Sequence, residues 1–288
     1  MRGLEVDCVQ SAPAVRRSPC GLAFDVIDLV PPWHRPGPPV VFVHGIGASR
    51  GIWADWLPLI AVQHPVLRFD LRGFGDSAAL AETVTMTPTP ELMALLIDDL
   101  MEVIDAAGFN GPVHLVGESA GGTVVLAAAV RHAVRVASVT ISNAAFVGAG
   151  IGQIHGWQDL FAAGGVAAWS ARMMECRFAP GELDLPHAAW FASQQERTVP
   201  EVALRISAML AQMDLTAELA MLQAPLLILA PTASPFVPLA MAEQLQHLVS
   251  GATLRVFSDA RHGLPFSHAQ ACAQALQNFL QSASSLVA

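Results

Sequence analysis

Lysine and tyrosine are missing from this chain of 288 residues, and all of its basic residues are arginines. Their absence excludes a lysine base and a tyrosine acid from any mechanism. Charged residues make up only 14% of the chain and hydrophobic residues 53%, so the composition allows a large buried core. The formal net charge is −9 and no basic residues cluster, so we expect no nucleic-acid partner.

Cysteine is scarce. The four cysteines are scattered along the chain, at Cys8, Cys20, Cys176 and Cys272. No pair has the spacing of a metal site, so we expect reduced thiols and no bound metal. Glycines or prolines break the two long uncharged runs, and Glu5 and Asp7 interrupt any signal-peptide pattern. We therefore expect a cytoplasmic protein with no membrane partner.

Glycine, in contrast, is concentrated in residues 117–122, which read Gly-Glu-Ser-Ala-Gly-Gly. An apolar run, Val113–Val116, precedes this motif, and a small-residue helical run, Thr123–Val130, follows it. A strand that turns sharply into a helix through such glycines leaves room for one side chain at the apex, that of Ser119. The turn exposes this hydroxyl at the carboxyl edge of a sheet, beside the amides of the helix N-terminus. We expect Glu118 to point away from that position.

Other apolar runs alternate with helical patterns. The predicted strands are residues 22–30, 40–43, 66–69, 113–116, 136–141, 226–229 and 254–257. The predicted helices include residues 52–62, a helix with Thr89 as its N-cap that Gly108 ends, and residues 269–280. This alternation favours an α/β fold with a mostly parallel sheet covered on both faces. Residues 145–218 carry helical patterns alone and are expected to form an insertion at the carboxyl edge of the sheet.

Four motifs, in this order, resemble those of the α/β-hydrolase fold superfamily. They are His44-Gly45-Ile46-Gly47, the loop 70–77, the motif 117–121 and Arg261-His262-Gly263. The likeness is to small lid-bearing bacterial esterases and 3-oxoadipate enol-lactonase-like hydrolases. It implies an eight-stranded, mostly parallel sheet with helices on both faces and a helical lid inserted after the sixth strand. The core would comprise residues 1–144 and 219–288, and the helical cap (lid) residues 145–218.

The resemblance also implies roles for individual residues. Ser119 would be the nucleophile and His262 the base that takes its proton. The backbone N–H groups of Ile46 and Ala120 would form the oxyanion hole. Such chemistry needs no metal and no organic cofactor. The expected partner is a small-molecule substrate, and the chain is expected to be a monomer or a homodimer.

One position departs from the family pattern. Family members carry an acid after the strand that corresponds to residues 226–229, but Ser234 stands there and the loop 230–238 has no Asp or Glu. Three interpretations remain open. In the first, a carboxylate from elsewhere in the chain, such as Asp259, orients His262. In the second, which we favour slightly, Ser234 or a water molecule that it holds orients His262. In the third, the site is catalytically weak and serves binding.

The cap offers further candidates. Trp157, Met173 and Trp190 are expected to line the substrate site or to form the core of the cap. Four basic residues of the cap could bind a substrate carboxylate: His155, Arg172, Arg177 and His187. The favoured interpretation is that they lie on the solvated surface of the cap.

These observations predict a serine hydrolase that cleaves a small ester, lactone or related carbonyl bond through an acyl-enzyme at Ser119. Two alternatives stay open. One is another reaction on the same scaffold, such as carbon–carbon bond hydrolysis, acyl transfer or cofactor-free oxygenation. The other is a ligand-binding protein with a degenerate catalytic site.

Overall fold

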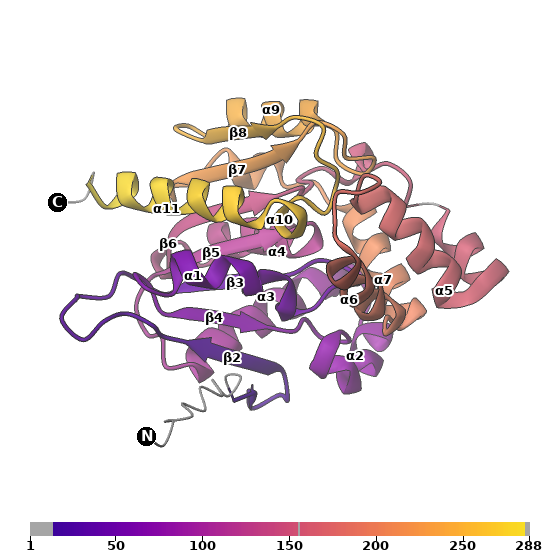
Figure 1. Cartoon of the computed structure of the whole chain (residues 1–288), viewed down its shortest axis with the longest axis horizontal. Helices are drawn as coiled ribbons and strands as arrows, with labels where there is room; N and C mark the ends of the chain where they lie inside the picture. The colour runs from indigo at the N-terminus through magenta and orange to yellow at the C-terminus, as the bar shows by residue number, and fades with distance from the viewer. Residues whose placement is uncertain (1–13, 155, 286–288) are drawn as a thin grey trace, which may run out of the picture.

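An eight-stranded sheet forms the centre of the computed structural model, which describes residues 14–154 and 156–285 (Figure 1). The strand order is β1-β2-β4-β3-β5-β6-β7-β8. β2 pairs antiparallel with β1 and with β4, and every other pairing in the sheet is parallel. The predicted fold class is thereby confirmed.

The strands are β1 (Arg16–Arg17), β2 (Ala23–Ile27), β3 (Val40–Val43), β4 (Val66–Phe69), β5 (Val113–Glu118), β6 (Val136–Ser142), β7 (Leu226–Pro231) and β8 (Thr253–Phe257). The α-helices are α1 (Leu57–Ile60), α2 (Ala81–Met86), α3 (Thr89–Ala106), α4 (Ala120–Arg131), α5 (Trp157–Arg177), α6 (Leu185–Glu196), α7 (Pro200–Gln212), α8 (Thr216–Leu219), α9 (Leu239–Leu248), α10 (Leu264–Ser267) and α11 (Ala269–Ser285).

Side-chain alternation along the buried strands divides the core into two apolar clusters. In β3, Val41 and Val43 join the cluster that packs against α3, α4 and α9. Val40 and Phe42 point to the other face and join the cluster formed with α1 and α11. A parallel strand buried on both faces needs apolar residues at every position, and the continuous run 40–43 meets this need.

The insertion after β6 contributes α5, α6 and α7, which gather at one end of the sheet on the right of Figure 1. Its packing is shared with the rest of the molecule, because Trp169 and Ile206 of the insertion belong to the same apolar cluster as β3. The division into a core of residues 1–144 and 219–288 and a cap of residues 145–218 stays a prediction. Residues 1–13 of that core, with Glu5, Asp7 and Cys8, lie outside the described residues.

Two local predictions were wrong. Residues 52–62 do not form one helix: a 3-10 helix over Arg50–Trp56 is followed by the single turn of α1, which ends at Ile60. Thr89 does not cap α3, because the chain is still extended at Pro88, which takes the cap position, and Thr89 is already the first helical residue.

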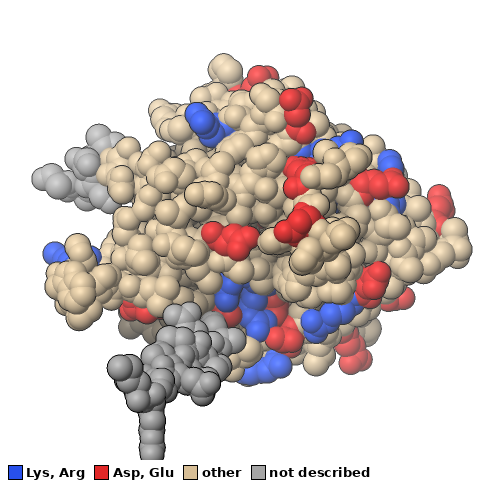
Figure 2. All heavy atoms as spheres, viewed as in Figure 1, with Lys and Arg blue, Asp and Glu red and all other residues tan. Residues whose placement is uncertain are grey.

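Charged side chains of both signs are scattered over the face seen in Figure 2, and uncharged residues cover much of this surface. Among the described residues, no helix combines the length and the apolar character that crossing a membrane requires.

Candidate active site

The turn between β5 and α4 holds Ser119 in a rare backbone conformation, with φ 54° and ψ −122°. The glycines around it are needed for close packing. A Cβ at Gly117 would lie 2.5 Å from the carbonyl oxygen of Gly121, and one at Gly122 would lie 2.5 Å from the Cβ of Ala144. A strained non-glycine residue at such a turn persists only because the surrounding structure fixes it, and strain of this kind concentrates at functional sites.

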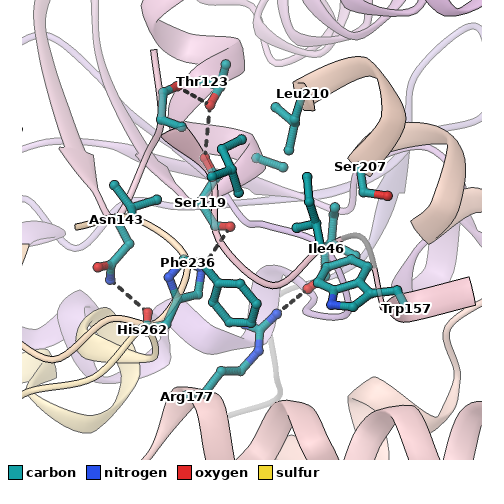
Figure 3. A pocket seen from close by; sticks show the side chains of 15 residues that line it. Ile46, Ser119, Thr123, Asn143, Trp157, Arg177, Ser207, Leu210, Phe236 and His262 are labelled. Carbon is teal, nitrogen blue, oxygen red and sulfur yellow. Dashed lines mark hydrogen bonds between the residues drawn. The ribbon is translucent and has the colours of Figure 1, made fainter. Parts of the chain in front are cut away.

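His262 meets this serine from a segment far away in the chain. It lies on the loop between β8 and α10, and its Nε2 is 3.0 Å from the Ser119 Oγ (Figure 3). The Asn143 side chain donates a 2.7 Å hydrogen bond to the His262 carbonyl, and the Phe236 ring packs against the imidazole with 4.7 Å between the ring centroids. These contacts fix both the backbone and the ring of His262.

The second ring nitrogen of His262 faces Ser234, whose Oγ lies 3.1 Å from Nδ1. The amides of Phe236 and Val237 also donate to this oxygen, over 3.4 and 3.3 Å. Asp259 is exposed in the turn that directly follows β8, where its amide donates to the Thr232 side chain. Of the groups that the sequence offered as orienters of His262, Ser234 is the one in contact with it.

The sequence interpretation of Glu118 was wrong. Its side chain turns towards the site, and one carboxylate oxygen lies 3.9 Å from His262 Nε2. The other oxygen accepts the Gly45 N–H at 2.8 Å. Arg177 pairs with this carboxylate over 3.7 Å and donates to the Ile46 carbonyl at 2.6 Å, so it lies beneath the cap rather than on a solvated surface (Figure 3).

Burial sets the electrostatics of these groups. It holds the pKa of His262 well below the usual value, and the nearby Arg177 charge lowers that pKa further. Burial also raises the pKa of Glu118, against the opposing effects of Arg177 and the Gly45 amide. His262 is therefore neutral in the resting site, and a neutral imidazole is the form able to accept a proton.

A small cavity opens beside Ser119 and His262. Ile46 and Ala120, the two residues predicted to supply oxyanion N–H groups, both line it. His44 fixes the loop that carries Ile46, because its Nε2 accepts the Leu71 N–H at 3.0 Å and its Nδ1 bonds the Gly45 carbonyl at 2.8 Å. Among the described residues, no group of three or more His, Cys, Asp or Glu side chains is arranged to hold a metal.

The predicted cap residues separate into two groups. Trp157 lines the cavity, but Met173 and Trp190 do not. Met173 is buried in the apolar cluster that joins the cap to the sheet, and Trp190 stacks on Phe266, with 5.5 Å between ring centroids, on the other side of the core. Arg172 is half exposed and pairs with Glu175.

Two further candidates do not join the site. His187 is half exposed and bonds Asp184, and His155 lies outside the described residues. Residues that the sequence did not single out also line the cavity: Thr123, Asn143, Ser207 and Phe236. Thr123 follows Ser119 by one helical turn, a spacing that could have identified it.

The family model described as the alpha/beta hydrolase fold matches residues 38–269 of the chain. The chain belongs to the α/β-hydrolase fold family. The match includes the Ser119 turn and His262, and it confirms the resemblance that the four motifs indicated.

Individual relatives are more distant. The chain is 25% identical over 263 residues to 3-oxoadipate enol-lactonase 1 of Acinetobacter baylyi, which covers 85% of this chain and 89% of that protein. Its fold is similar to that of the enol-lactonase from Burkholderia xenovorans, with a TM-score of 0.77 and 21% identity over 93% of this chain and 100% of the other. It is also similar to the Exiguobacterium antarcticum esterase, with a TM-score of 0.76 and 20% identity over 94% and 100% of the two chains.

Proposed function

We propose that this protein is a serine hydrolase that cleaves a small ester, lactone or related carbonyl bond through an acyl-enzyme at Ser119. One observation carries the proposal: the Ser119 hydroxyl, at the apex of a strained turn, contacts His262 at 3.0 Å and faces a cavity. A serine hydroxyl is a weak nucleophile until a base within hydrogen-bond reach accepts its proton.

The steps follow from this geometry. The Ser119 Oγ attacks the substrate carbonyl while its proton passes to Nε2 of His262. The amides of Ile46 and Ala120 stabilise the oxyanion. His262 then gives the proton to the leaving group, and a water molecule activated in the same way releases the acyl group.

The lining of the cavity suits a small and partly polar substrate. Three of its lining side chains keep a buried polar atom without a hydrogen-bond partner among the described residues: Asn143 Oδ1, Trp157 Nε1 and Arg177 Nε. The similarity to an enol-lactonase and an esterase supports an ester or lactone as the bond that is cleaved.

Ser119→Ala tests the proposal. Turnover of an activated aryl ester should fall by about 10⁴-fold or more, since loss of a nucleophile removes most of the catalysis, while circular dichroism stays unchanged. Ser193→Ala is the matched control, because Ser193 is exposed on α6 and, among the described residues, its hydroxyl bonds only to Trp190 and Gln194 of the same helix. Full activity in Ser119→Ala would contradict the serine mechanism.

A ligand-binding protein is the second candidate, and the uncharged Ser234 beside His262 is the observation that favours it. A covalent fluorophosphonate probe separates the two functions. Labelling of Ser119 supports an activated nucleophile, whereas failure to label at any pH between about 5 and 9 supports a binding role.

A further inference from the structure

When His262 accepts a proton, its ring becomes positively charged, and no negative charge lies on the side of the ring that faces Ser234. His262 is only 3% exposed, so the imidazolium that forms when it accepts the Ser119 proton gains little from water. Its Nδ1 partner is a neutral hydroxyl, Ser234. A hydroxyl fixes the ring and its tautomer but brings no negative charge.

A carboxylate does lie on the other side of the ring, where the proton arrives. Glu118 is 2% exposed, and its Oε1 is 3.9 Å from Nε2 of His262. The Gly45 amide holds the other carboxylate oxygen at 2.8 Å. A Cβ at position 45 would lie 2.5 Å from that oxygen, so glycine is required for the carboxylate to lie here.

Arg177 balances this buried carboxylate. Its guanidinium is 3.7 Å from Glu118 Oε1 and is anchored on the Ile46 carbonyl. Arginine remains protonated in proteins, so its charge opposes the burial that disfavours an ionised glutamate.

These two groups, Glu118 at the end of β5 and Arg177 at the end of α5, are the charged groups that face His262 among the described residues. Arg261 precedes His262 in the chain, but its side chain turns away to the carbonyls of Glu175 and Phe178.

We propose that Glu118 is a positioning residue whose carboxylate compensates the imidazolium charge on His262, in place of the acid missing from the 230–238 loop. The inference rests on the proposed roles of Ser119 and His262. In each half-reaction the proton moves between an oxygen and His262 Nε2, and Glu118 itself neither gains nor loses one. Its contribution is electrostatic, and it does not touch the substrate.

Two variants test this inference. Glu118→Gln keeps the shape of the side chain and removes its charge. Because Arg177 would then be buried without its partner, the double variant Glu118→Gln/Arg177→Met removes both charges and avoids the folding penalty of an unpaired ion. Asp99→Asn is the control for losing a carboxylate from a buried ion pair, because Asp99 pairs with Arg72 outside the cavity.

Two measurements apply to each variant. The first is the pKa of His262, followed by NMR of its ring nitrogens. The second is the rate at which Ser119 is labelled by an uncharged fluorophosphonate, measured across pH. An uncharged probe avoids any direct effect of Arg177 on binding.

We expect Glu118→Gln to show a lower His262 pKa and labelling slowed by about tenfold or more, since preorganised charge contributes at least on that scale. The double variant should show slowed labelling but a smaller fall in this pKa, because it also removes the Arg177 charge that lowers it. Asp99→Asn should leave both unchanged. Ser234→Asp, added to either Glu118 variant, should restore labelling, because it returns a carboxylate to the other side of the ring. A merely structural role for Glu118 would not predict this rescue.

An unchanged His262 pKa and labelling rate in folded Glu118→Gln would overturn the inference, and so would slowed labelling of the double variant that Ser234→Asp fails to restore. Absence of labelling in the unmodified protein would count against the serine mechanism alone. The NMR titration would still decide the role of Glu118.

Discussion

At the scale of single residues, three nitrogen atoms converge on the Ser234 hydroxyl. The amides of Phe236 and Val237 donate to it over 3.4 and 3.3 Å. His262 Nδ1 lies at 3.1 Å and is a donor in the tautomer that leaves Nε2 free to accept the Ser119 proton. A hydroxyl has two lone pairs for these donors, whereas a carboxylate has two oxygens and a negative charge. The loop therefore provides the donors that a carboxylate at this position would need.

Ser234→Asp should raise turnover of an activated ester by about tenfold or more, because the new charge would stabilise the His262 imidazolium directly. Ser234→Asn is the matched control, since it has nearly the same shape without the charge. The measurement is kcat/KM for both variants. Equal values for the two would mean that charge at this position does not limit the reaction.

The sequence identified Ser119, His262 and Ser234 because local motifs mark them. It also named Glu118 and Arg177 but placed neither beside His262, because their positions depend on how the cap packs on the core. Arg172 and Arg177 lie on the same helix, yet their side chains are 46% and 3% exposed. No periodicity in a weakly amphipathic helix separates such residues.

At the scale of elements, the contact between α4 and β3 determines where the Ser119 turn lies. Gly121 packs so closely against this strand that a Cβ would overlap the carbonyl oxygens of Val43 and His44. Both obstacles are backbone atoms, so no side-chain rotation relieves the overlap. The helix would have to move, and Ser119 at its N-terminus would move with it.

Gly121→Ala should therefore destabilise the protein by about 1–3 kcal/mol or more and reduce esterase activity, because overpacking shifts backbone that holds the site. Gly111→Ala is the control, as a Cβ there would meet nothing within 4 Å. Urea unfolding and ester turnover measure the two effects. If the two variants proved equally stable, the close approach of α4 to β3 would be refuted.

The sequence predicted elements well where one strong signal determined them. The run 40–43 coincides with β3, since continuous apolar residues suit a strand buried on both faces. The predicted strand 66–69 coincides with β4, although it contains Arg68, which is buried against Asp25. β1, with its two exposed arginines, has no apolar pattern and was missed. The kink in α5, where Gly165 has a φ of 64°, also left no periodic signal.

At the scale of the whole molecule, the cap and the sheet are joined through the loop that carries Ile46. The Trp169 ring of α5 packs against Gly47, where a Cβ would lie 2.6 Å from the ring. Trp169 is fully buried, stacks with Phe161 and makes an edge-to-face contact with Trp157, which lines the cavity. The packing of the cap is thus coupled to the loop beside Ser119.

Buried histidines link the stability of this fold to pH. His114 in β5 lies beside His64, with 5.4 Å between ring centroids, and its Nδ1 bonds the Ser138 hydroxyl at 2.8 Å. Burial, with a smaller effect of His64, lowers the pKa of His114 to about 4. Burial also lowers the pKa values of His44 and His64. In the folded state these side chains are therefore neutral at pH 7.

Acid should consequently destabilise the protein. Below a pH of about 6.5 the unfolded chain binds a proton at His114 that the folded chain rejects, so the free energy of unfolding falls as pH falls. The loss attributable to His114 should approach about 3 kcal/mol near pH 4. Urea unfolding between about pH 8 and pH 4.5 measures this effect. The free energy of unfolding should depend less steeply on pH in His114→Asn than in the unmodified protein. His34→Asn, at an exposed position, is the control and should leave the slope unchanged. Parallel curves for His114→Asn and the unmodified protein would mean that His114 takes up its proton at the same pH in the folded and the unfolded chain, contrary to the effect of its burial.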